Sequence, residues 1–121
     1  MNIDSVKEIE RLNFEDILWV IFIMLSILNI VSNNCQKNYV KSNEQFYEDR
    51  ANNISIFVLL ILFFVYLYFF FRNYNMYNNK DNPTDADLIK VMGSVFFIIG
   101  TLCLLYFQVC SDDNFIGGPA L

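Results

Sequence analysis

The chain has 121 residues, of which 55% are hydrophobic and 17% aromatic, and its formal net charge is -5. Three membrane spans of about 20 residues with short connections would use that length, so we expect one membrane domain over residues 1–121 and no separate soluble domain. No basic patch of the kind that binds nucleic acid is visible in this acidic sequence. The sequence contains no histidine, the commonest general base and transition-metal ligand. We therefore predict an all-α membrane protein that is not an enzyme and uses no cofactor.

The N-terminal residues 3–13 carry apolar side chains at nearly helical spacing, with charged residues between them. Ser5 and Glu8 fit the capping-box pattern S-x-x-E, which predicts that a helix starts there. Two interpretations are open. The segment is either a helical lead-in to the first span or an amphipathic helix on the membrane surface.

The first span is predicted over residues 14–33. Glu15 and Asp16 lie at its start, where carboxylates favour the positive end of a helix dipole; the alternative is the entrance of a cation path. Ser26 and Asn29 are three residues apart and share one face of the helix. We expect them to make polar contacts with another helix inside the membrane, with a pore lining as the alternative.

The second helix is predicted over residues 43–77, around the uncharged 18-residue stretch Ile54–Phe71. Ser42 and Gln45 fit a capping box S-x-x-Q, so we expect this helix to start well outside the bilayer and form a projecting helical hairpin with the first span. Its apolar stretch lacks small residues from position 56 to position 71. It must therefore pack through large side chains or face lipid, and we expect it to carry more of the lipid contact than the third helix, whose small-residue face is expected to pack against protein.

The third helix is predicted over residues 84–110. Thr84 and Asp87 resemble a capping box at its start. Neighbouring acids suggest calcium, but they lack the glycine and the terminal glutamate of an EF-hand loop, so we predict no metal site.

Small residues in the third span predict a helix-packing face. Gly93 and Gly100 are seven residues apart and therefore share a face, with Thr101 beside it. Close approach of backbones at small residues is the main route to helix association in lipid. We expect this face to pack against the first helix or against a neighbouring subunit.

The distribution of basic residues predicts the orientation. The N-terminus and the second loop carry five basic residues, and the first loop with the tail carries three. Basic residues favour the cytoplasm, so we predict a multi-pass protein of the cell membrane with the N-terminus cytoplasmic and the C-terminus outside. Cys35 and Cys110 would then both lie at the outer surface, either joined in a disulfide or as free thiols.

The C-terminal residues 111–121 contain an apolar Phe-Ile pair followed by Gly-Gly-Pro, which does not allow a regular helix. This apolar tail is either a frayed end or a segment that folds back onto the bundle or the interface.

These features leave three classes of function. The first is a homo-oligomeric structural or regulatory membrane subunit that acts by helix packing, with the lipid bilayer and further copies as its partners. The alternative is a self-assembling channel or holin-like pore. A transporter or enzyme is disfavoured, because it would be expected to carry a charged residue deep in a span.

Overall fold

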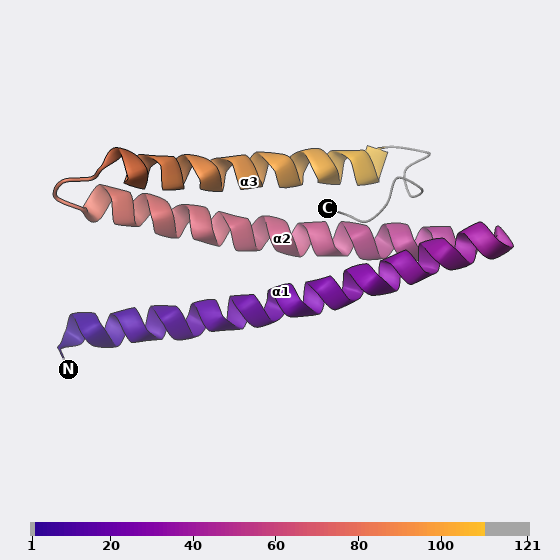
Figure 1. The fold of residues 1–121 in the computed structure, drawn as a ribbon, viewed down its shortest axis with the longest axis horizontal. Coiled ribbons are helices and arrows are strands. Elements are labelled where there is room, and N and C mark those ends of the chain that lie inside the picture. The colour runs from indigo at the N-terminus through magenta and orange to yellow at the C-terminus, as the bar shows by residue number, and fades with distance from the viewer. Residues whose placement is uncertain (1, 111–121) are drawn as a thin grey trace.

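The computed structural model describes residues 2–110, which form three helices joined by two short connections (Figure 1). The helices are α1 (Ile3–Ser42), α2 (Gln45–Asn79) and α3 (Asp85–Cys110). Each is long and apolar enough to cross a membrane. The prediction of an all-α membrane protein with three transmembrane helices is therefore confirmed.

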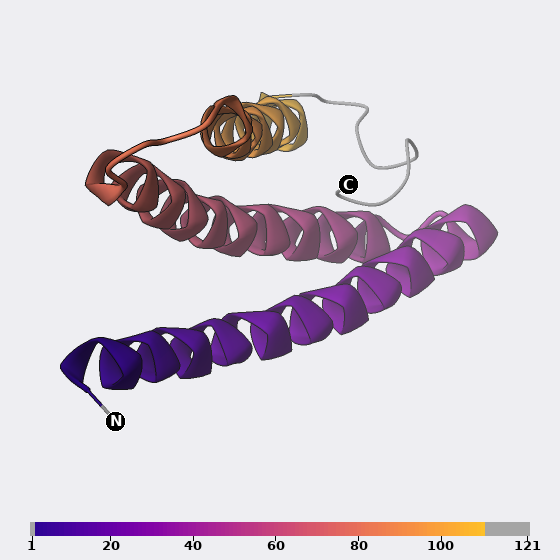
Figure 2. The same ribbon diagram turned by 60° about the vertical axis from the view of Figure 1, so that its left-hand side comes forward.

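Helix α2 lies between α1 and α3, as both views show (Figures 1 and 2). Helices α1 and α2 form an antiparallel hairpin, and α3 runs back along the other side of α2. The predicted arrangement of a helical hairpin plus a third helix is thus confirmed. Helices α1 and α3 each pack mainly on α2. The sides of α1 and α3 that face away from α2 can therefore contact lipid or other proteins.

The hydrophobic core lies along α2. Val58 and Leu59 of α2 are fully buried, and Leu62 of α2 and Leu25 of α1 complete the cluster. The expectation that α2 would carry more of the lipid contact is therefore wrong, because α2 is the middle helix and is contacted from both sides. Large side chains that point away from both neighbours, such as Phe57 and Phe64, stay exposed.

Helix α1 is continuous over 40 residues, roughly 60 Å at 1.5 Å per residue, which is twice the thickness of a bilayer core. The segment 3–13 is thus the beginning of the spanning helix. The side chain of Asn2 caps the helix by accepting from the backbone N–H of Ser5 at 2.8 Å. The predicted capping box of Ser5 and Glu8 is not formed, because the helix already begins at Ile3.

The hairpin turn consists of Asn43 and Glu44 alone. Asn43 has a left-handed backbone (φ 57°), a conformation that asparagine tolerates and that ends α1. The hydroxyl of Ser42 donates to the carbonyl of Asn38 within α1 at 2.7 Å. Ser42 therefore belongs to the first helix, and the capping box predicted for it and Gln45 is not formed. The second helix begins within two residues of the predicted position 43, whereas residues 34–42, predicted to connect the first two spans, are the end of α1.

The start of α3 confirms the predicted capping box. The backbone N–H of Thr84 donates to Asp87 Oδ2 at 2.9 Å, and the N–H of Asp87 donates to Thr84 Oγ1 at 3.3 Å. Lys80 Nζ lies 2.9 Å from the same carboxylate. The backbone bond from Thr84, followed by the ammonium of Lys80, lowers the pKa of Asp87 to about 2.

Candidate functional site: a buried polar network at one membrane boundary

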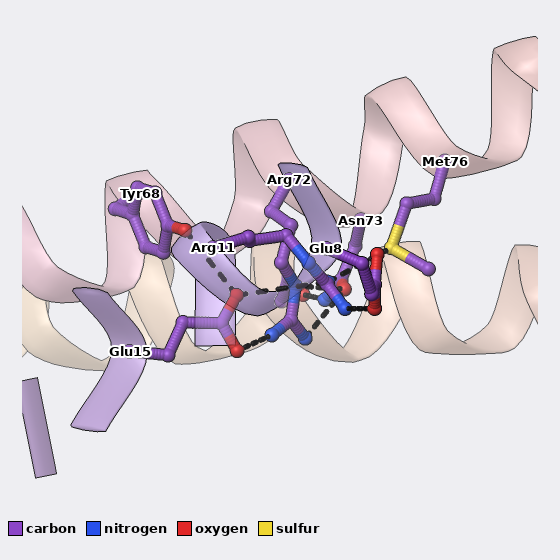
Figure 3. Close-up of polar contacts among 8 residues, drawn as sticks. Glu8, Arg11, Glu15, Tyr68, Arg72, Asn73 and Met76 are labelled. Atoms are coloured by element: carbon purple, nitrogen blue, oxygen red, sulfur yellow. Dashed lines mark hydrogen bonds and ion pairs between the residues drawn. The ribbon is translucent and has the colours of Figure 1, made fainter. Parts of the chain in front are cut away.

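The antiparallel hairpin brings together two opposite charges, Glu15 of α1 and Arg72 of α2. Arg72 Nη1 donates to Glu15 Oε1 at 2.6 Å (Figure 3). Glu15 is only 6% exposed, so the surrounding protein shields this carboxylate almost completely from solvent and lipid. A charge in such a position is stable only when it is paired and hydrogen-bonded.

Both carboxylate oxygens of Glu15 are engaged. The hydroxyl of Tyr68 donates to Oε2 at 3.2 Å, and Arg11 Nη1 lies 3.6 Å from the same oxygen. Arg11 also forms an ion pair with Glu8 one turn earlier. Two carboxylates and two guanidinium groups therefore balance within one cluster, which makes its formal charge zero.

The network continues from Arg72 to the third helix. Arg72 Nε and Nη2 donate to Asn73 Oδ1 at 3.3 and 3.0 Å, and the guanidinium lies 4.9 Å from the ring centre of Phe69. Asn73 Nδ2 then donates to Ser94 Oγ on α3 at 2.6 Å. Asn73 and Ser94 are both buried. One connected set of polar contacts thus links all three helices.

A second contact between α1 and α2 lies near their hairpin end. The hydroxyls of Ser32 and Ser55 are 3.3 Å apart, and Ser32 Oγ also donates to the carbonyl of Ala51 at 3.3 Å. Ser32, Ser55 and Ala51 are all buried. Small residues at this position let the two backbones approach closely.

These two contacts set the register of the hairpin in the membrane. Glu15 and Ser32 are 17 residues apart on α1, and their partners Ser55 and Arg72 are 17 residues apart on α2. At 1.5 Å per residue this is roughly 26 Å, close to the thickness of a bilayer core. The polar contacts therefore lie at the two ends of the apolar region.

No known protein family, characterised protein or solved structure matches this chain. Its function must therefore be argued from the arrangement of its own residues.

The polar residues predicted to bridge helices, Ser26 and Asn29, make no such bridge within residues 2–110. Ser26 is exposed and donates to the carbonyl of Phe22 in its own helix at 3.0 Å. Asn29 is half-buried, and within the described residues its Oδ1 has no hydrogen-bond partner. The side of α1 that faces α2 carries Leu18, Leu25 and Ser32 instead. The predicted contacts are therefore absent within residues 2–110, and contacts with a helix of another chain stay a prediction.

The predicted small-residue face of α3 is open. Apart from its chain neighbours and the adjoining backbone of α3, a Cβ at Gly93 or Gly100 would meet no atom of residues 2–110 within 4 Å. Thr101 is buried, and its hydroxyl donates to the carbonyl of Phe97 at 2.8 Å. The two glycines therefore do not pack against α1, because α2 separates α1 from α3. Packing against a neighbouring subunit stays a prediction.

All three cysteines within the described residues are free thiols. Cys35 is buried and Cys110 is exposed, and of the two alternatives for this pair the structure has the free thiols. The predicted docking or fraying of the tail 111–121 lies outside the described residues.

The sequence analysis did not predict the pairing of Glu15 with Arg72. The predicted place of Glu15 at the positive end of a helix dipole is wrong, because α1 begins at Ile3 and Glu15 is well inside the helix. The missed signal is that Glu15 precedes one apolar stretch and Arg72 follows the next, which places both at the same end of an antiparallel hairpin. The missed signal for the second contact is the spacing of Ala51 and Ser55, two small residues four apart.

Proposed function

We propose that this protein is a structural or regulatory membrane subunit that acts by helix packing and assembles into homo-oligomers, and that it has no catalytic activity of its own. The support is where its polar groups lie. Among residues 2–110, seven buried residues are polar or charged: Glu15, Ser32, Ser55, Asn73, Ser94, Thr101 and Gln108. The outward surface of the spans carries mainly large apolar side chains. Such a surface suits contact with lipid and other helices better than the wall of a water-filled pore.

The observation that supports self-assembly is the open flank of α3. Gly93 and Gly100 lie one turn to either side of Phe97, so these three residues share a flank of the helix. Both glycines have free space beside them in the described part of the chain. A helix from a second copy can therefore approach the backbone of α3 closely, which is the geometry that favours association in lipid.

The test compares Gly100→Leu with Cys103→Leu, which adds bulk to an exposed position on the same helix. Within one chain a Cβ at position 100 meets open space, and glycine costs a helix about 0.8–1 kcal/mol relative to alanine, with leucine close to alanine. A monomer should therefore become slightly more stable. If α3 packs against a second copy, Gly100→Leu should instead shift the detergent-resolved particle from oligomer to monomer, while Cys103→Leu leaves the oligomer intact.

A wild-type protein that runs as a monomer at all concentrations would contradict the proposal. An oligomer that is equally stable in both variants would show that a different face forms the interface. A map of the oligomer with a water-filled central opening would favour the channel alternative, because helix packing alone requires no such opening.

We also propose that the end of the bundle carrying the Glu15–Arg72 pair faces the cytoplasm. The support is the excess of basic residues at that end, five against three. The three native cysteines are first replaced by serine, because Cys110 is an exposed thiol at the opposite end of the bundle. A cysteine introduced at the exposed Asn79 should then react with a membrane-impermeant thiol reagent only after the cells are opened. Labelling of this cysteine in intact cells would show that this end of the bundle faces outward.

A further inference from the structure

A basic hollow lies beside the ion-pair network, where the C-terminal part of α2 meets the start of α3. Its volume is about 660 Å³. Four cationic side chains contribute to its lining: Arg11, Arg72, Lys80 and Lys90. They come from all three helices and the connection after α2, so the hollow exists only in the folded bundle.

The charges around this hollow do not cancel. Glu8 and Glu15 pair with the two arginines, and Asp87 pairs with Lys80. Within residues 2–110, Lys90 forms no ion pair, and Arg11 Nε is buried without a hydrogen-bond partner. One positive charge and one buried donor therefore remain for an anion, in a protein whose net charge is -5.

A second hollow, the aromatic hollow, adjoins the first. Its volume is about 430 Å³, and both hollows share Arg72 and Asn73. Glu15 and Ser94 also line it beside these two polar residues. The rest of its lining consists of aromatic side chains on the three helices: Trp19, Phe22, Tyr66, Phe69 and Phe97. Tyr66 and Phe97 stack across α2 and α3 with ring centres 5.1 Å apart. The aromatic hollow therefore lies within the membrane-spanning part of the bundle, and the basic hollow lies at the boundary of that part.

We propose that the two hollows together bind one anionic phospholipid, with its phosphate headgroup in the basic hollow and an acyl chain in the aromatic hollow. Arginine and lysine side chains are the usual partners of phosphate oxygens, and basic pockets between transmembrane helices bind acidic headgroups. A soluble anion would use only the basic hollow. An amphiphilic ligand is favoured because the two hollows meet at Arg72 and Asn73.

The only tryptophan of the sequence, Trp19, lines the aromatic hollow and reports on its occupant. The full-length protein is placed in phosphatidylcholine nanodiscs that contain a small fraction of phosphatidylglycerol with brominated acyl chains. Bromine quenches tryptophan fluorescence on contact. We expect quenching well above that given by the same fraction of brominated phosphatidylcholine, because the acidic lipid is concentrated at the site.

Lys90→Gln and Lys7→Gln form the matched pair of variants. Both remove one positive charge from the same end of the bundle, but only Lys90 lines the hollow. Neither substitution removes an ion pair within the described residues, so folding should not suffer. The preference for the acidic lipid should fall about five-fold in Lys90→Gln and change little in Lys7→Gln.

Three results would overturn the proposal. Equal quenching by the two brominated lipids would show that the site does not select an anionic headgroup. An equal loss of the preference for the acidic lipid in both variants would show that this preference comes from the general surface charge of the protein. Displacement of the acidic lipid by millimolar inorganic phosphate, at constant ionic strength, would identify a site for soluble phosphate instead. The inference uses residues of a single copy and does not depend on self-association.

Discussion

The pairing of Glu15 with Arg72 makes a quantitative prediction for the stability of the hairpin. The substitutions are Glu15→Gln, Arg72→Gln and the double variant. Arg72→Gln leaves a nearly buried carboxylate without its closest partner, the guanidinium nitrogen at 2.6 Å. Breaking a buried ion pair in this way costs about 3–5 kcal/mol, and we expect the lower value because Tyr68 and Arg11 still contact Glu15.

The other variants should lose less stability. Glu15→Gln leaves Arg72 with a neutral acceptor, and the side chain of Arg72 is 18% exposed, so we expect a loss of about 1–2 kcal/mol. The double variant removes both charges and should lose less than the two single variants together. The resulting coupling energy should be about 2 kcal/mol.

The assay is reversible unfolding by sodium dodecyl sulfate in mixed micelles, followed by Trp19 fluorescence and circular dichroism. Trp19 of α1 lies 6.2 Å from Phe69 of α2, ring centre to ring centre, so its fluorescence reports on the docking of the two helices. Asp16→Asn is the matched control, because Asp16 is the adjacent carboxylate and is exposed. A coupling energy below about 0.5 kcal/mol, or an Arg72→Gln variant as stable as the control, would refute the argument.

Two further predictions concern the hairpin end and the start of α3. Ser55→Leu should destabilise the hairpin by roughly 1–3 kcal/mol, because Ser55 is 2% exposed and closely packed, whereas Ser26→Leu at an exposed position should be nearly silent in the same unfolding assay. The lowered pKa of Asp87 stabilises the fold above pH 4, and this contribution should be lost as the pH falls toward 2. The melting temperature should therefore drop over that range in the wild type and less in Asp87→Asn; an equal drop in both would assign the acid sensitivity to other groups.

The sequence by itself determined that this is a membrane protein with three spanning helices. An uncharged stretch such as Ile54–Phe71 matches the thickness of a bilayer core, and this match does not depend on neighbouring helices. The capping box of Thr84 and Asp87 was also predictable, because its hydrogen bonds join residues three apart in the chain. Local signals failed at Ser5 and Ser42, where the same pattern occurs inside a longer helix.

Only the tertiary structure decided which faces meet. Helical periodicity tells which residues share a face, but lipid solvates one apolar face as well as another, so hydrophobicity does not choose a partner. The choice rests on a few polar and small residues that act across long sequence separations, such as Glu15 with Arg72 and Ser32 with Ser55. The alignment of these pairs along α1 and α2 follows from the folded hairpin and not from any local sequence pattern. For the same reason α2, which holds the most apolar 18-residue stretch of the three helices, is the middle helix rather than the one most exposed to lipid.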